Sequence, residues 1–340
     1  MATLSKIQFS MNLLLFLAFT PVAFSTVPSS SVSSIDQIQY WSNNVLNTMP
    51  NTIASKLSPL SKQDSNYFTS LVSSKQTISF DHAKFCSKAK LVCSTTSNQT
   101  PQSLNPSGFK IYSAIAQASD AAVAVPNSFF RLSILQKGYK FHLPDLNDQT
   151  PFRAFLPNQI ASKISTTNSI DLQKLFPESF TSANTKEAIE ASIHYCSSPR
   201  IKGEIKSCPN SLEDMINFSK KSLGGSKLIA FTSQSTKGSK QEVKIQNIKQ
   251  FRAEKVVSCH EVFFPFATYF CHQLSSTRIY SVDLIDPATK APVNKLVALC
   301  HMDTSGWPAE HVAFKVLKSS PGDAEACHWI TQRDLVWMAN

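Results

Sequence analysis

Four Cys-His dipeptides near the C-terminus constrain this chain more than any other feature. They are Cys259-His260, Cys271-His272, Cys300-His301 and Cys327-His328. The chain has 340 residues with only eight cysteines and eight histidines, so a random order would give fewer than one such pair. In a β-strand, adjacent side chains point to opposite faces of the sheet. Each dipeptide therefore predicts a sulfur on one face and an imidazole on the other.

The segment "KLVALCHMD" illustrates this separation. One face of the predicted strand would hold Leu296, Ala298, Cys300 and Met302, and the other Val297, Leu299 and His301. The cysteines can then cross-link the fold while the histidines stay available on the other side. The dipeptides also lack the C-x₂₋₄-C…H-x₃₋₅-H spacing of a Cys₂His₂ zinc site, so the sequence does not favour one.

The histidines of the four dipeptides are the predicted metal ligands. We expect these rings to meet at one site: His260, His272, His301 and His328. Imidazole clusters suit Cu(II), Zn or Ni, and Cu(II) stands highest in the affinity order. His311 and Asp303 are second-tier candidates because they lie near the dipeptides in sequence. The alternatives are four histidines hydrogen-bonded separately around a β core, or a metal with a purely structural role.

The N-terminus predicts a secretory signal peptide over residues 1–25. Lys6 precedes an apolar run, and Ala23 and Ser25 provide small residues for cleavage before Thr26. The run is too short for a membrane span, and no later segment is continuously apolar, so we expect a secreted protein with no membrane span. A buried N-terminal helix is the alternative.

Secretion implies an oxidising compartment, in which all eight cysteines are disulfide candidates. Cys86 and Cys93 bracket six residues, and Cys196 and Cys208 flank a helix connection, so both pairs predict local disulfides. The partners of Cys259, Cys271, Cys300 and Cys327 stay open, because sequence does not choose among the pairings. Two sequons, at Asn98 and Asn217, fit a secretory route.

The hydrophobic patterns indicate an α+β fold with a β-rich C-terminal half. Residues 26–127 predict short helices, irregular segments and a turn-rich linker, and a domain boundary falls near Asn127. Helices are expected over 184–196 and, with Ser211 as N-cap and Gly224 as the stop, over 212–223. Strands are expected over 227–234, 242–248, 278–286, 295–303, 311–318 and 326–330.

The charge balance is basic. The chain carries a net charge of +10, and nine Lys or Arg residues between Lys220 and Lys255 face only Glu242 and Glu254. Such a surface attracts polyanions. For a secreted protein, an acidic polysaccharide is a better partner than nucleic acid. The alternative is a lysine-rich face that only maintains solubility.

The dipeptides are separated by ten, 27 and 25 residues, and Trp337 follows eight residues after the last. This spacing resembles the plant BURP-domain pattern. "GYKFHLPDL", "CHMDTSGW" and "CHWI", with "YWSNN" and "FCSKAKLVC" upstream, are similar to the branch that contains the non-catalytic (beta) subunit of polygalacturonase. The resemblance implies a disulfide-stapled BURP domain over 128–340, preceded by a short, partly helical N-terminal region. Members of that branch usually carry a long array of Phe-Thr-Asn-Tyr-Gly-type repeats, which this chain lacks between Ser94 and Asn127.

Two functions are compatible with these features. The first is a secreted, non-catalytic protein of the plant cell wall or apoplast that associates with pectin or polygalacturonase and modulates wall properties. No G-x-S-x-G motif and no evident acid/base carboxylate pair point to hydrolysis. The second is a copper-dependent peptide cyclase, which some BURP proteins resemble, acting on Tyr40 and Trp41 in the single "QIQYW" stretch.

We expect "VFFPFATYF" to be core, and Trp337 to pack against the Cys-His cluster with a partner for its indole N–H.

Overall fold

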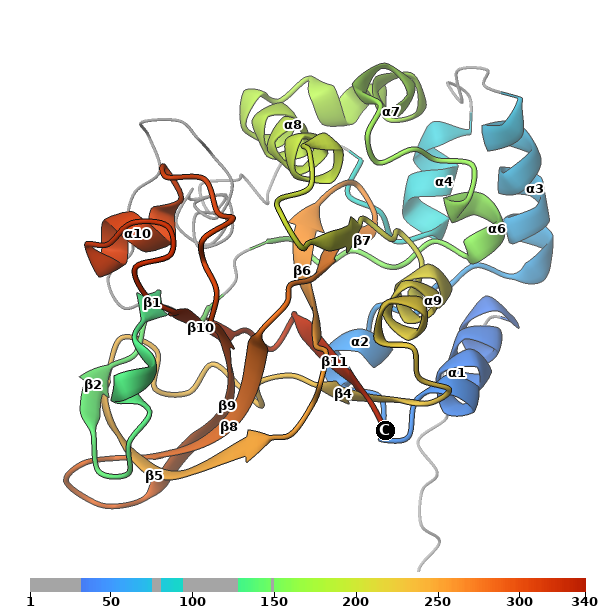
Figure 1. The fold of residues 1–340 in the computed structure, drawn as a ribbon. Helices are drawn as coiled ribbons and strands as arrows, with labels where there is room; N and C mark the ends of the chain where they lie inside the picture. The colour runs from blue at the N-terminus through green and yellow to red at the C-terminus, as the bar shows by residue number, and fades with distance from the viewer. Residues whose placement is uncertain (1–31, 75–80, 94–127, 148–149) are drawn as a thin grey trace, which may run out of the picture. The chain divides into compact units, whose positions relative to one another are not determined.

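Two antiparallel sheets and a group of helices make up the described part of the chain (Figure 1). The computed structural model describes residues 32–74, 81–93, 128–147 and 150–340. One sheet has six strands in the order β1-β10-β9-β8-β5-β2, and the other has five in the order β3-β7-β6-β11-β4. The predicted α+β class is confirmed, with a β-rich C-terminal region and a partly helical N-terminal one. None of the described helices is both long and apolar enough to cross a membrane.

The strands lie almost entirely in the second half of the chain. Their bounds are β1 Phe129–Phe130, β2 Lys140–His142, β3 Ile205–Ser207, β4 Leu228–Phe231, β5 Glu242–Phe251, β6 Val257–Phe263, β7 Ala267–Gln273, β8 Thr277–Ile285, β9 Pro292–His301, β10 Ala326–Ile330 and β11 Leu335–Ala339. Strands β6 and β7, and strands β8 and β9, pair as antiparallel hairpins with short connections.

The helices precede and interrupt the strands. Their bounds are α1 Val32–Asn44, α2 Asn51–Ala54, α3 Lys62–Ser73, α4 His82–Lys88, α6 Asn158–Ala161, α7 Ser169–Leu175, α8 Ala183–Ser197, α9 Leu212–Leu223 and α10 Val312–Leu317, with 3₁₀ turns η2 Leu132–Ile134 and η3 Pro177–Phe180. Helix α9 begins and ends as its sequence predicts. The Ser211 hydroxyl accepts a hydrogen bond from the Asp214 N–H at 3.1 Å, and Gly224 adopts the left-handed conformation with φ 72°.

One predicted strand is wrong, because residues 312–317 form helix α10. The alternation of Val312, Phe314 and Val316 suggested a strand, but a short apolar run fits either structure. The His311 ring favours the helix here, because its Nδ1 accepts a hydrogen bond from the Ala313 N–H at 3.2 Å and so caps the first turn. The buried side of α10 then packs against β1.

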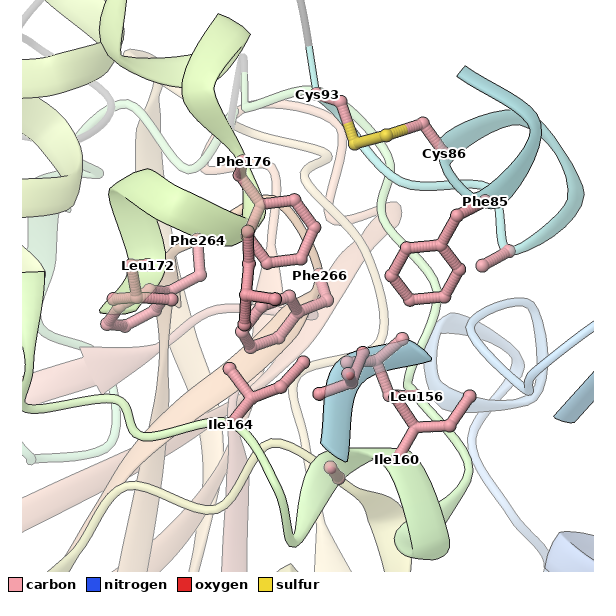
Figure 2. Close-up of a cluster of buried hydrophobic side chains, with 14 of the residues drawn as sticks. Phe85, Cys86, Cys93, Leu156, Ile160, Ile164, Leu172, Phe176, Phe264 and Phe266 are labelled. Atoms are coloured by element: carbon pink, nitrogen blue, oxygen red, sulfur yellow. A yellow bond between two sulfur atoms is a disulfide. The ribbon is translucent and has the colours of Figure 1, made fainter. Parts of the chain in front are cut away.

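The N-terminal helices share hydrophobic cores with the sheets. Trp41 of α1 is buried and lies 5.5 Å from Trp337 of β11 between ring centroids. Helices α3 and α4 contribute Phe68 and Phe85 to a second core, which also contains the β6–β7 turn. Figure 2 shows this core, where Phe85 and Phe176 lie beside the Cys86–Cys93 disulfide. The predicted core segment 262–270 is buried except for Phe270, which is half-buried.

The two sheets pack face to face through a third apolar core. From the six-stranded sheet it includes Ile279, Val297 and Leu299, and from the five-stranded sheet Val336. The opposite face of β9 buries Leu296, Ala298 and Cys300 in a separate core. The predicted alternation along β9 is therefore confirmed. Because His301 follows Leu299 on the same face, it points into the space between the sheets.

Candidate imidazole site between the sheets

The first two dipeptides lie on the hairpin formed by β6 and β7. Cys259 and Cys271 are directly opposite each other in the register and form a disulfide. His260 pairs with Phe270 in the register and His272 with Ser258, so the two histidines are diagonal neighbours on the other face. Diagonal neighbours in an antiparallel pair are within reach of aromatic side chains. Their ring centroids are 5.6 Å apart.

Strands β9 and β10 repeat this arrangement in the other sheet. Cys300 is directly opposite Cys327, and the two form a disulfide. His301 pairs with Ala326 and His328 with Leu299, which again makes the histidines diagonal neighbours. Their ring centroids are 5.5 Å apart. A disulfide on one face of each strand pair thus fixes two imidazoles on the other face.

The two imidazole pairs meet across the interface between the sheets. Ring centroids are 5.5 Å apart for His260 and His328, and 6.0 Å apart for His272 and His301. With the two distances inside each sheet, the four rings form a closed quadrilateral. All four predicted ligands therefore lie together, and we call them the imidazole cluster.

Hydrogen bonds fix which nitrogen carries the proton in His301 and His328. The Thr277 hydroxyl donates to the Leu274 carbonyl at 3.0 Å, so His301 Nδ1, 3.1 Å from that hydroxyl oxygen, must be the donor there. His328 Nδ1 lies 3.3 Å from the Trp329 carbonyl oxygen, which only accepts. These contacts assign the ring proton to Nδ1 in both histidines, and this assignment places a lone pair at each Nε2.

These two lone pairs face each other. The His301 and His328 Nε2 atoms are 3.4 Å apart, with no proton between them in the neutral tautomers. Two acceptors at this separation repel unless a cation lies between them. Two nitrogens bound to one tetrahedral zinc at about 2.0–2.1 Å would be roughly 3.3 Å apart. The pair is therefore spaced as two ligands of one metal ion.

Carboxylates lie behind the other two rings. His272 Nδ1 is 3.3 Å from Glu204 Oε1, and His260 Nδ1 is 3.8 Å from Asp334 Oδ1. Metal-binding histidines commonly donate their second ring N–H to a carboxylate or carbonyl. Three of the rings thus have Nδ1 within 3.3 Å of an oxygen, and His260 Nδ1 lies farther, at 3.8 Å, from its carboxylate. The Nε2 atom of each ring is then the nitrogen left for a ligand bond.

The spacing of the ring nitrogens matches one metal ion for His301 and His328, but the four rings together are too far apart to bind one ion as they stand. In the described ranges, the sole group of three potential ligands with all donor atoms within 4.8 Å consists of His82, Cys86 and Cys93. No three rings of the imidazole cluster converge that closely.

Burial favours the neutral form of three histidines of the cluster. It lowers the pKa of His328 to about 3, helped by the neighbouring imidazoles, and holds the pKa of His301 well below its ordinary value. The pKa of His272 is also lowered, mainly by burial. His311, beside the cluster, has a pKa lowered to about 3 for the same reason. Neutral imidazole is the form that binds metals.

We expect acid to destabilise the metal-free protein. Between the ordinary histidine pKa of about 6.5 and the lowered native pKa values, the unfolded chain binds more protons than the folded one. The free energy of unfolding should therefore fall as pH falls, by up to about 1.4 kcal/mol per pH unit for each histidine that stays neutral. Urea unfolding between about pH 7 and pH 5 measures this slope. His328→Leu should reduce it, and the exposed His142→Ala should not; a flat profile would contradict the prediction.

A cavity of about 390 Å³ opens beside the imidazole cluster. Its lining includes all four histidines of the cluster, with Phe129, Phe270, Trp307 and His311 as an aromatic wall and Arg200, Lys206, Glu204 and Glu310 as charged residues. Trp307 and His311 pack with centroids 4.4 Å apart, and His301 lies 5.3 Å from Trp307. His311 is thus part of the site. Asp303 is not, since its Oδ1 accepts hydrogen bonds from Ser305 on an exposed loop.

Other predicted residues lie outside this cavity. Both expected local disulfides are present, Cys86–Cys93 and Cys196–Cys208. Asn217 is exposed on α9 and its amide oxygen accepts a hydrogen bond from Tyr40, whereas residues 1–25 and Asn98 lie outside the described residues. Glycosylation stays a prediction for both asparagines.

Trp337 packs against the sulfurs and not the imidazoles. It shares a core with Cys259 and Cys271, on the face of the five-stranded sheet that turns away from the cluster. The expectation of a partner for its indole N–H is wrong, because Nε1 has no hydrogen-bond acceptor among the described residues. Sequence reasoning also missed Glu204, Asp334 and Thr277, whose positions depend on long-range contacts that leave no local signal.

Comparison with known proteins places the chain in a family. The BURP domain family profile matches residues 128–339. Over 217 residues, the chain is 40% identical to Polygalacturonase 1 beta-like protein 1 of Arabidopsis thaliana, covering 62% of this chain and 35% of that protein. It is 39% identical over 217 residues to Polygalacturonase-1 non-catalytic subunit beta of Solanum lycopersicum, covering 62% and 34%. BURP domain-containing protein 14 of Oryza sativa subsp. japonica is 35% identical over 216 residues, covering 62% and 31%.

The chain thus aligns with about a third of the length of these relatives. The four Cys-His dipeptides, the disulfides that pair their cysteines and the imidazole cluster all fall inside the matched segment. Since the profile covers more than half of the chain, this protein belongs to the BURP-domain family, on the side of the polygalacturonase beta-like proteins.

Proposed function

We propose that this protein is a secreted, non-catalytic component of the plant cell wall or apoplast that associates with acidic pectin, with polygalacturonase, or with both. The observation that carries the proposal is the 39% identity over 217 residues to a protein named as a non-catalytic polygalacturonase subunit. The net charge of +10 supports attraction to a polyanion. The signal peptide expected from residues 1–25 supports secretion.

The edge of the six-stranded sheet supplies a basic surface for such a polyanion. Lys140 of the edge strand β2 is directly opposite Lys244 of β5. Like charges at directly opposed positions destabilise a strand pair. Neither lysine forms an ion pair with a described residue, and the same holds for the exposed Lys249. A polyanionic ligand along this edge would relieve the repulsion.

Binding to polygalacturonate should therefore depend on salt and on this edge. We expect the fraction bound in pull-down to fall severalfold from low salt to high salt, because exposed charges are screened beyond a Debye length of about 10 Å at 0.1 M. Lys140→Ser/Lys244→Ser/Lys249→Ser should weaken binding at low salt.

The matched control removes the same charge from the helical region, as Lys163→Ser/Lys174→Ser/Lys186→Ser, and should bind nearly as well as the wild type. Salt-independent binding would contradict the electrostatic basis. Equal weakening by both triple variants would show that net charge matters and that the edge does not.

We further propose that the imidazole cluster holds a metal ion, with Cu(II) or zinc as the candidates. His301 and His328 would bind first and His260 and His272 complete the set, since Nδ1 lies within 3.3 Å of an oxygen in three of the rings and 3.8 Å from one in His260. Bound metal would link the two sheets at the point where the rings meet, and copper would also supply redox chemistry. Glu204 would hold His272 in the orientation for binding.

Alanine substitutions should rank these residues. We expect His301→Ala and His328→Ala each to nearly abolish metal binding, as measured by elemental analysis and calorimetric titration. Each change removes one of the two Nε2 atoms that are already spaced to bind the same metal ion. Glu204→Gln should weaken affinity by roughly 10–100-fold, as outer carboxylates do. His142→Ala on the exposed strand β2 serves as the control. Stoichiometric metal in His301→Ala/His328→Ala would contradict the assignment.

The geometry gives less support to a peptide cyclase acting on its own Tyr40 and Trp41. Both residues lie in helix α1, and the Trp41 side chain is only 3% exposed, packed against Trp337. Helix α1 contributes no residue to the lining of the cavity beside the imidazole cluster. An aromatic substrate in this stretch would first have to leave the hydrophobic core. The binding role therefore accounts for the described structure better.

A further inference from the structure

A second group of metal-binding side chains lies in the N-terminal helices, outside the imidazole cavity. His82 and Cys86 are on helix α4, and Cys93 follows five residues after that helix ends. Their donor atoms all lie within 4.8 Å of one another, and the three residues are buried. The two sulfurs are joined as a disulfide here, so they are not available to a metal in this state.

The histidine is already placed as a ligand. His82 Nε2 lies 3.5 Å from Cys86 Sγ, and Glu178 Oε1 lies 3.8 Å from His82 Nδ1 on the other side of the ring. A sulfur and a nitrogen bound to one tetrahedral zinc would be about 3.6 Å apart, given Zn–S of about 2.3 Å and Zn–N of about 2.0–2.1 Å. The carboxylate behind the ring resembles the outer partner of metal-binding histidines.

Backbone contacts hold both cysteines independently of the disulfide. The Leu91 N–H donates to the Cys86 carbonyl at 2.8 Å, and the Val92 N–H donates to the Pro265 carbonyl at 2.8 Å. The Ser179 hydroxyl donates to the Cys93 carbonyl at 2.8 Å. Reduced thiols would therefore remain close, and two thiolates on zinc need a separation of only about 3.8 Å.

The hydrophobic core fixes the helix that carries two of the donors. Phe85 is fully buried between Phe68 and Phe176, at centroid distances of 4.6 and 6.3 Å. Figure 2 shows the disulfide at the edge of this core, above Phe85 and Phe176. The Cys-His disulfides of the sheets differ, because their sulfurs are on the face opposite the imidazoles and are wholly buried.

We propose that Cys86, Cys93 and His82 form a zinc site that opens when their disulfide is reduced. A dithiol reductant transfers two electrons and two protons to the disulfide, which becomes two thiols, while the dithiol becomes a disulfide. Zinc then binds two thiolates and the neutral His82 ring, with release of the two thiol protons and with water in the fourth position. The pair would thus hold zinc under reducing conditions and a covalent cross-link under oxidising ones.

Cobalt(II) as a probe of the full-length protein distinguishes this site from the imidazole cluster. After mild dithiol reduction, Co(II) should develop a thiolate-to-cobalt charge-transfer band and zinc binding should rise by about one equivalent. The oxidised protein should lack the band, since an imidazole-only site contains no thiolate. His82→Ala should lower the zinc affinity of the reduced site by more than tenfold, and Glu178→Gln by roughly tenfold. His142→Ala is the matched control.

Alkylation and peptide mass spectrometry show which cysteines are reduced, and circular dichroism shows whether the fold survives. Absence of the charge-transfer band in folded, reduced protein would overturn the proposal. Zinc affinity unchanged in His82→Ala would also overturn it, as would unfolding on reduction of Cys86–Cys93 alone, because the backbone contacts would then not hold the thiols. Loss of pectin binding or of metal at the imidazole cluster would leave it intact.

Discussion

Replacing Glu261 with glutamine should lower the free energy of unfolding by about 3–5 kcal/mol, because the change leaves buried cations without a counter-charge. The Glu261 carboxylate forms ion pairs with Lys56 and with Arg153, the latter at 2.7 Å, and all three side chains are at most 4% exposed. Arg333 adds a contact at 3.6 Å. Burial lowers the pKa of Lys56 to about 8, and these cations hold the pKa of Glu261 below its ordinary value despite burial.

Urea or thermal unfolding measures this effect, and an exposed ion pair provides the control. Asp64→Asn breaks the Lys88–Asp64 contact at 2.6 Å, in which the lysine side chain is 45% exposed, and should cost less than about 1 kcal/mol. Adding Lys56→Met to Glu261→Gln should restore part of the lost stability, since one uncompensated charge is removed. Equal effects of Glu261→Gln and Asp64→Asn would refute a buried network.

Removing the Cys300–Cys327 disulfide should cost about 3–4 kcal/mol and also loosen the imidazole cluster. The bond closes a sequence separation of 27 residues, and chain-entropy estimates grow with loop length. Without it, β9 and β10 keep their ladder, but the diagonal placement of His301 and His328 loses its covalent constraint. Cys300→Ser/Cys327→Ser should therefore unfold at lower denaturant and bind metal more weakly.

The Cys86–Cys93 pair supplies the comparison, since its separation is only seven residues. Cys86→Ser/Cys93→Ser should cost about 2–3 kcal/mol by the same estimate and leave metal binding at the imidazole cluster unchanged. If both double variants bind metal equally well, the disulfide on the opposite face does not position the rings.

The sequence predicted the local features of this fold well. Helix α9 followed from its capping residues, and the alternation along β9 placed Cys300 and His301 on opposite faces, because a strand has a strict period of two. Helix α10 was mistaken for a strand, since a run of six residues in which only Lys315 is polar fits a short strand as well as a short helix. Its cap, a ring nitrogen of His311, is not among the usual N-cap signals.

The residues that surround the imidazole cluster could not be predicted from the sequence. The four histidines stood out because the dipeptide repeats, but Glu204, Asp334 and Thr277 come from three separate segments and carry no repeated signature. A long connection that contains α10 joins β9 to β10. The length of this connection therefore could not predict that Cys300 lies opposite Cys327. The buried ion pairs of Glu261 likewise join residues up to 205 positions apart.

Evolutionary boundaries and folding boundaries differ in this protein. The recognised domain begins at residue 128, yet Trp41 lies against Trp337 and Lys56 neutralises Glu261, both inside that domain. A recombinant fragment that starts at residue 128 would expose the apolar surface that α1 covers and would remove Lys56 from the buried ion-pair network of Glu261. A chimera that exchanges BURP domains between homologues would therefore also have to exchange the upstream helices.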